Sequence, residues 1–120
     1  MKKRFLLFVL CALVAGTFCS CNDTFSKNYP ILYVVNGTDY SVEVYCDNHL
    51  VATAGAHNNS GKVELNNTSI NLPVLVEAEF YDNKGKRVGG YKWSSYHFSW
   101  NKSYKMTLTT SSSSSSLKEL

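Results

Sequence analysis

Apolar and polar residues alternate with a period of two along most of this chain, and that pattern restricts it to β-structure. The segment Tyr40–Cys46 is the clearest case, because Val42, Val44 and Cys46 fall on one side of an extended strand. A strand places successive side chains on opposite faces, so this spacing indicates a half-buried strand. From Ile31 to Thr109 no segment shows the spacing of an amphipathic helix. The pattern therefore predicts an all-β fold.

Turn signals divide this region into short strands. Asp47–Asn48 and Asp82–Gly85 contain residue types that tolerate the backbone of tight turns. The pair Gly89–Gly90 indicates a β-bulge. Strands are expected at residues 31–35, 40–46, 49–52, 61–65, 72–81, 87–93 and 103–109, with a loop at 55–60.

About seven strands of this length within residues 30–109 predict one small antiparallel β-sandwich. The pattern resembles both immunoglobulin-like and transthyretin-like sandwiches, and it does not choose between them. The paired cysteines and core tryptophan of antibody domains are absent. Residues 21–120 are enough for one domain and too few for two.

The first twenty residues have the layout of an export signal. Lys2, Lys3 and Arg4 precede an unbroken apolar run of eleven residues, Phe5–Ala15. A basic end, an apolar middle and a processing site are the three parts of a signal peptide. A membrane span needs about 20 apolar residues, so we expect residues 1–20 to be a signal-peptide helix that is removed.

A cysteine stands where this signal ends. The pair Ser20–Cys21, followed by Asn22–Asp23, resembles the processing box of bacterial lipoproteins in its Bacteroidota form, with Phe18 at the position of the usual leucine. The resemblance implies a diacylglyceryl thioether and an N-acyl chain on Cys21, and no other cofactor. Each buried methylene contributes about 0.8 kcal/mol, so two or three acyl chains anchor a protein durably. Cys19 is a competing acceptor, but the bulky Phe18 precedes it where the box has a small residue.

The lipoprotein resemblance also implies a location. The chain is expected to be lipid-anchored to the outer membrane, with residues 21–29 as the lipidated N-terminus and linker. Surface-exported Bacteroidota lipoproteins tend to carry an acidic cluster after the cysteine, whereas this chain has only Asp23 there. This favours the periplasmic side over the cell surface.

The charge of the mature region excludes one class of partner. Of the twelve lysines and arginines, three lie in the signal, which leaves nine cations against nine acids. A neutral domain without a basic cluster has no electrostatic footprint for nucleic acid and no polybasic patch for anionic lipid. Contact with the membrane is therefore expected through the acyl chains alone.

No motif indicates catalysis or a metal site. Cys46 is the one thiol left after processing, and its place in an alternating strand indicates a small buried hydrophobe. His49, His57 and His97 lack the spacing of metal ligands. Ser99–Lys102 has the Ser-x-x-Lys form of penicillin-interacting enzymes but lacks their companion motifs. We expect a protein that is not an enzyme.

The richest local feature is an aromatic segment near the end of the sandwich region. Its candidate binding residues are Tyr91, Trp93, Tyr96, Phe98 and Trp100. In an extended backbone Tyr96, Phe98 and Trp100 share one face, as do Tyr91 and Trp93. Rows of aromatic rings can stack on sugars or contact another protein, and the same rings can instead fill the end of a small core. The sequence leaves both interpretations open.

The last eleven residues, 110–120, include six consecutive serines. A segment of this composition buries little apolar surface, so a flexible Ser-rich tail is expected.

Two functions are consistent with these features. The first is a lipid-anchored cell-envelope protein that acts as a non-enzymatic binding or accessory module, with an envelope protein or a glycan as its partner. The alternative is a structural subunit of an envelope assembly, joined to its neighbours by β-strand addition at an open sheet edge.

The anchor gives a direct prediction. Mass spectrometry of the protein isolated from its native envelope is expected to find an N-terminal peptide that starts at Cys21 and carries the diacylglyceryl and acyl groups that the resemblance implies. An unmodified Cys21, or cleavage further downstream, would contradict the anchor.

Overall fold

The alternation in the sequence becomes the burial pattern of the strands. In β2 (Ser41–Cys46) and β5 (Val74–Tyr81) every second side chain is buried. Both strands lie in the middle of a sheet, where one face packs on the core. The other strands are β1 (Ile31–Asn36), β3 (His49–Ala54), β4 (Asn59–Glu64), β6 (Arg87–Tyr96), β7 (Ser103–Leu108) and β8 (Ser116–Glu119).

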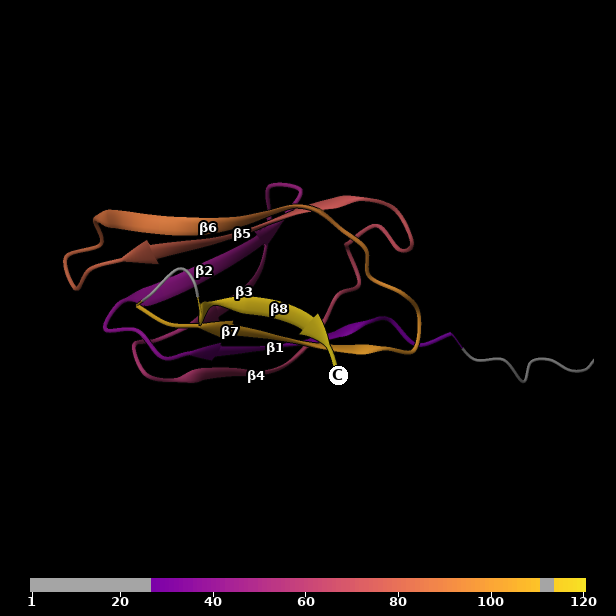
Figure 1. Ribbon diagram of the computed structural model, residues 1–120, viewed down its shortest axis with the longest axis horizontal. Coiled ribbons are helices and arrows are strands. Elements are labelled where there is room, and N and C mark those ends of the chain that lie inside the picture. Colours follow the sequence, from indigo (N-terminus) through magenta and orange to yellow (C-terminus); the bar gives the residue numbers. More distant parts are fainter. Residues whose placement is uncertain (1–26, 111–113) are drawn as a thin grey trace, which may run out of the picture.

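The computed structural model describes residues 27–110 and 114–120, and these form two four-stranded sheets that pack face to face (Figure 1). One sheet has the order β4-β1-β7-β8 and the other the order β3-β2-β5-β6. The predicted all-β sandwich is confirmed, with eight strands in the described residues rather than about seven. The predicted signal-peptide helix (residues 1–20), Cys21 and the linker up to residue 26 lie outside the described residues.

One strand pair departs from the expected antiparallel arrangement. β1 lies between β4 and β7, and it pairs antiparallel with β4 but parallel with β7, from Ile31 beside Ser103 to Asn36 beside Leu108. A parallel pair needs a long connection between its strands, and here that connection runs through the whole other sheet. Local turn signals report only hairpins, so the sequence pattern could not reveal this pairing.

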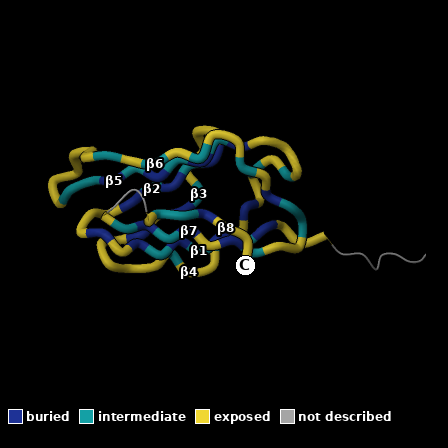
Figure 2. The backbone as a smooth tube through the Cα atoms, viewed as in Figure 1, coloured by how far each residue is buried: buried dark blue, intermediate teal, exposed yellow. Residues whose placement is uncertain are grey.

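The core fills the space between the sheets, where the buried residues gather (Figure 2). Fully burying one large aliphatic or aromatic side chain contributes about 1.5–3 kcal/mol, so these residues hold the two sheets together. They are Leu32, Val34, Val42, Val44, Cys46, Ala52, Ala54, Leu65, Val74, Val76, Ala78, Phe80, Phe98, Tyr104, Met106, Leu108 and Leu117.

The predicted turn and bulge are confirmed. Asp47 and Asn48, between β2 and β3, have φ angles of 49° and 70°, as a two-residue hairpin turn requires. The register between β5 and β6 shifts beside Gly89. A Cβ atom on Gly90 would lie 2.6 Å from the carbonyl oxygen of Ala78, so the close approach of these two strands requires glycine there.

Three strands begin at other positions than predicted, and β2 differs by one residue because it begins at Ser41 rather than at residue 40. β4 begins at Asn59, inside the expected loop, because it pairs with the end of β1. β5 begins at Val74 rather than at residue 72. Pro73 has no N–H for a ladder bond, and Leu72 before it is exposed.

The flexible tail predicted for residues 110–120 is corrected at its C-terminal part. Ser116–Glu119 forms β8, which pairs antiparallel with β7. Leu117 faces the core and is only 8% exposed, while the hydroxyl of Ser115 accepts a hydrogen bond of 3.1 Å from the backbone N–H of Thr109. The free edge of β7 and the burial of one leucine side chain are enough to order a segment whose composition indicates a loop.

No helix among the described residues is long and apolar enough to cross a membrane.

The burial of Leu117 in β8 predicts unequal effects of two leucine substitutions on stability. Leu117→Ala is expected to lower the free energy of unfolding by about 2 kcal/mol, because it leaves a cavity between the sheets. Leu120→Ala is the matched control, since that side chain is 67% exposed, and its effect is expected to stay within about 0.5 kcal/mol. Urea unfolding followed by tryptophan fluorescence measures both, and equal effects would contradict the burial of β8.

Candidate functional site

The aromatic residues predicted as binding candidates do not form one ridge. Tyr91, Trp93 and Tyr96 lie on the edge strand β6, and their side chains are half-buried against the core. β6 ends at Tyr96, where the chain leaves the sheet. Phe98 and Trp100 therefore do not continue the face of Tyr96, because the extended backbone that this expectation assumed stops before them.

Phe98 belongs to the core. It is fully buried, and its ring centroid lies 4.9 Å from that of Tyr104 and 5.0 Å from that of Tyr96. The hydroxyl of Tyr104 accepts a hydrogen bond of 2.8 Å from the backbone N–H of Ser99. Burial raises the pKa of Tyr96 above its ordinary value. These three rings close one end of the sandwich.

Trp100 lies near the entry of the described chain. The ring centroid of Trp100 is 5.2 Å from that of Tyr29. The Nζ atom of Lys27 lies 5.6 Å from the centroid of the Trp100 ring. Two hydrogen bonds of 2.8 Å fix this contact, because the backbone N–H of Asn101 donates to the carbonyl of Asn28 and the N–H of Asn28 donates to Oδ1 of Asn101. The start of the described chain is thus tied to the loop before β7.

A pocket of about 310 Å³ lies at the opposite end of the sandwich. It is formed by the loop between β1 and β2, the stem of the β5–β6 hairpin and the end of β7, which meet at the left of Figure 1. Its volume is at the lower end of the range of small-molecule sites, about 300–1,000 Å³. The lining residues are Thr38, Asp39, Tyr40, Phe80, Val88, Gly89, Gly90, Tyr91, Thr109 and Thr110.

Phe80 and Tyr91 form an aromatic wall of this pocket. Their rings meet edge-on, with centroids 5.5 Å apart. The hydroxyl of Tyr91 donates a hydrogen bond of 3.1 Å to the carbonyl oxygen of Thr109, which ties β6 to the end of β7. Gly89 pairs in register with Phe80 and faces the same side, where a Cβ atom would meet no other atom within 4 Å. The absence of a side chain at Gly89 keeps this space open.

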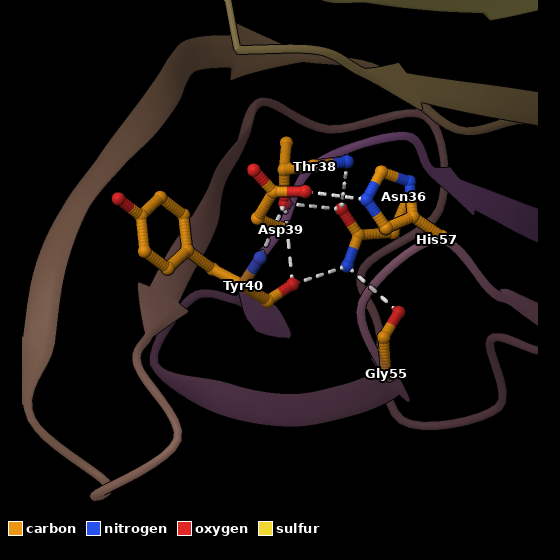
Figure 3. Close-up of polar contacts among 6 residues, drawn as sticks. All are labelled: Asn36, Thr38, Asp39, Tyr40, Gly55 and His57. Atoms are coloured by element: carbon orange, nitrogen blue, oxygen red, sulfur yellow. Dashed lines mark hydrogen bonds and ion pairs between the residues drawn. The ribbon is translucent and has the colours of Figure 1, made fainter.

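The rim at Thr38–Tyr40 is held by the buried side chain of Asn36 (Figure 3). Its amide group donates to the backbone carbonyls of Tyr40, at 2.7 Å, and Gly55, at 2.9 Å. Its carbonyl oxygen accepts from the N–H of Thr38, at 3.1 Å, and from the hydroxyl, at 2.7 Å. Asn36 is 1% exposed and Thr38 is 2% exposed. Buried polar groups are stable only when they are paired in this way.

Asp39 and His57 lie in solvent beside this network. Nε2 of His57 is 2.5 Å from Oδ1 of Asp39, and the side chains are 63% and 77% exposed. A contact this exposed contributes about 0–1 kcal/mol, so its effect is to orient the carboxylate rather than to hold the fold. Of the described residues that line the pocket, only Asp39 is charged.

Two tyrosine–glutamate pairs lie on the outer face of the β3-β2-β5-β6 sheet. The hydroxyl of Tyr45 donates to Glu43 at 2.5 Å, and that of Tyr81 donates to Glu79 at 3.0 Å. The hydrogen bond to the carboxylate raises the pKa of Tyr45 to about 12, and the equivalent bond also raises the pKa of Tyr81. Both phenols therefore stay protonated and remain donors at neutral pH.

The thiol of Cys46 is buried, as predicted, and forms no disulfide within the described residues. Burial raises its pKa to about 11, so it stays protonated and acts as a small hydrophobe. Within residues 27–110 and 114–120, no group of three or more His, Cys, Asp and Glu side chains is arranged to hold a metal ion.

The pocket was missed by sequence reasoning, which identified only Tyr91 among its lining residues. The available signal was the pair Gly89–Gly90, because glycine inside an alternating strand marks either a bulge or a place where another group comes close. The signal gives no information about the other walls. Thr38–Tyr40 and Thr109 meet there because β1 and β7 lie side by side, and no local pattern encodes that pairing.

The described residues form an all-β sandwich, and the pocket at Phe80 and Tyr91 lies at the end away from the chain entry. No family model, no curated protein and no solved structure matches this chain. The geometry of the described residues is therefore the basis for interpreting the site.

The Asn36 network gives a stability prediction. Asn36→Ala is expected to lower the free energy of unfolding by about 2 kcal/mol, because the carbonyl of Gly55 and the buried N–H of Thr38 lose the side chain that pairs with them. Asn66→Ala is the control, since that residue is exposed in a turn, and it is expected to change stability by less than about 0.5 kcal/mol. Urea unfolding of both variants measures the difference, and similar values would show that the network does not hold this end.

Proposed function

We propose that this chain is a lipid-anchored lipoprotein of the bacterial outer membrane that acts as a non-enzymatic binding module. The observation that carries the proposal is the position of the pocket, at the end of the sandwich opposite the entry of the described chain (Figure 1). β1 begins at Ile31 near that entry and ends at Asn36, whose side chain holds the rim of the pocket. The length of β1 therefore separates the entry of the described chain from the pocket.

In this proposal Cys21 carries the diacylglyceryl thioether and the N-acyl chain. Residues 21–29 reach about 30 Å when fully extended, so the domain stays near the membrane and presents its pocket away from it. The single acid after the cysteine, Asp23, favours the periplasmic side.

The chemistry of the pocket favours a neutral, hydroxyl-rich ligand such as the end of a glycan chain. Tyr40 and Tyr91 offer ring surface, which stacks on the apolar faces of sugars. The hydroxyl of the exposed Thr110 and the carboxylate of Asp39 add hydrogen-bonding groups. The described lining contains no lysine or arginine, so it offers nothing to neutralise a phosphate or a carboxylate ligand.

We also propose that the sandwich is of the transthyretin-like rather than the immunoglobulin-like kind. The strand order supports this, because β1 and β2 lie in different sheets. In an immunoglobulin constant domain the first two strands share one sheet.

The second candidate function is a structural subunit joined by β-strand addition. The ten-residue strand β6 favours it, because β6 is at the edge of its sheet and one side of its backbone has no neighbouring strand among the described residues. Exposed edges of this length are templates for a strand from another chain.

Filling the pocket tests the first function. Gly89→Leu is expected to weaken retention of residues 22–120 in affinity electrophoresis through amylose, xylan or mannan by about tenfold or more, because the added side chain occupies the hollow. The wild-type chain should be retarded in at least one of these gels.

Two comparison variants separate ligand binding from stability. Gly55→Leu adds the same side chain outside the pocket, where a Cβ meets only the side chain of Asn58 at an ordinary 3.5 Å. Tyr91→Phe keeps the packing of the ring on Phe80 and removes the hydroxyl, so it separates the contribution of the ring from that of the hydroxyl. Equal retention of the Gly89 and Gly55 variants, at unchanged melting temperature, would show that the pocket does not bind the glycan.

A further inference from the structure

The outer face of the β4-β1-β7-β8 sheet carries a row of lysines. The strand register places one residue of each strand side by side across the sheet, namely Lys62, Tyr33, Lys105 and Lys118. In β1 and β7 the neighbours of Tyr33 and Lys105 are buried, and all three lysines are exposed. One acid, Glu64, lies on the same face. We call Lys62, Lys105 and Lys118 the lysine face.

The outer face of the other sheet carries three glutamates, two of which have a cation nearby. Glu43 of β2 lies directly across from Glu79 of β5, and Glu77 is the next outward residue of β5. The Nε atom of Arg87 is 3.5 Å from Glu79, and the Nζ atom of Lys92 is 3.8 Å from Glu77. No lysine or arginine of the described chain forms an ion pair with Glu43. We call Glu43, Glu77 and Glu79 the glutamate face.

Each face contains a pair of like charges on directly opposed residues. Lys105 lies across from Lys118, and Glu43 lies across from Glu79. Such pairs destabilise a sheet when nothing compensates them. Both pairs span adjacent strands, so their Cβ atoms have the same spacing, about 4.5–5.5 Å. The two pairs match in spacing and are opposite in sign.

We propose that the lysine face docks on the glutamate face of a second copy of this chain. The contact brings Lys105 and Lys118, which form no ion pair among the described residues, against the carboxylates of Glu43 and Glu79. The contact is heterologous, because the two surfaces differ and lie on opposite sides of one domain, and a heterologous contact propagates from copy to copy. The result is a row of stacked domains. This inference goes beyond the proposed function and needs no ligand in the pocket.

The geometry of a row is compatible with one membrane. Both faces run along the strands, parallel to the line from the chain entry to the pocket (Figure 1). Copies stacked by translation therefore keep all their entries on one side and all their pockets on the other. Antiparallel pairing of two β6 edges, by contrast, turns one copy end over end.

Sedimentation velocity of the full chain tests the contact. The protein is purified from its envelope in detergent, with empty micelles in excess, and measured over a range of concentrations. Species larger than the monomer are expected at 0.1 M salt and their loss at 1 M, because the Debye length falls from about 10 Å to about 3 Å. A monomer at every concentration and salt would overturn the stacking and leave the pocket proposal unaffected.

Neutral substitutions identify the faces. Lys105→Gln with Lys118→Gln, and separately Glu43→Gln with Glu79→Gln, are each expected to weaken self-association by about tenfold or more. The lysine variant should not lower the melting temperature, because it removes a repulsion within its sheet. The glutamate variant also loses the contact of Glu79 with Arg87, so its association is measured below its own melting temperature.

Mixing the two double variants gives the decisive outcome. One variant keeps an intact glutamate face and the other an intact lysine face, so the mixture is expected to form pairs of chains and nothing larger. Lys84→Gln with Lys86→Gln, in the β5–β6 turn, is the control and should associate like the wild type. Association that persists in both face variants would overturn the proposal and indicate strand addition at β6 instead.

Discussion

The side-chain amide of Asn36 is the contact on which the pocket end of this domain depends. Asn36 ends β1 in one sheet and bonds to carbonyls at Tyr40, just before β2, and at Gly55, just after β3. It therefore joins the two sheets where the chain crosses between them. Apolar packing pulls the sheets together but has no direction, whereas a fully paired buried amide specifies one geometry. That geometry places Thr38 and Asp39 at the rim of the pocket.

The strands could be predicted from the sequence because burial in a sheet follows a period of two. Val42, Val44 and Cys46 face the core as their spacing indicates, and Asp47–Asn48 turns as its residue types indicate. β8 could not be predicted, since its burial depends on Leu117 meeting the free edge of β7. The serine-rich composition of this segment does not indicate that the edge of β7 is available for pairing.

The candidate site was predictable only in part, and for a related reason. Tyr91 lines the pocket, but Phe98 is part of the core because it packs on Tyr104, a residue of the following strand. Trp100 contacts Tyr29 from the other end of the described chain. Aromatic rings near one another in sequence thus serve different ends of the sandwich. Their roles depend on contacts with other segments, which the local pattern does not contain.

The position of β1 inside its sheet has a mechanical consequence. Traction on the N-terminus acts along β1, which is bonded to β4 on one side and to β7 on the other. The load is therefore a shear across two ladders, and their hydrogen bonds must rupture together. A strand at a sheet edge pulled from its end would peel away one bond at a time. The short strand β8 pairs only with β7, so it lies outside this load path.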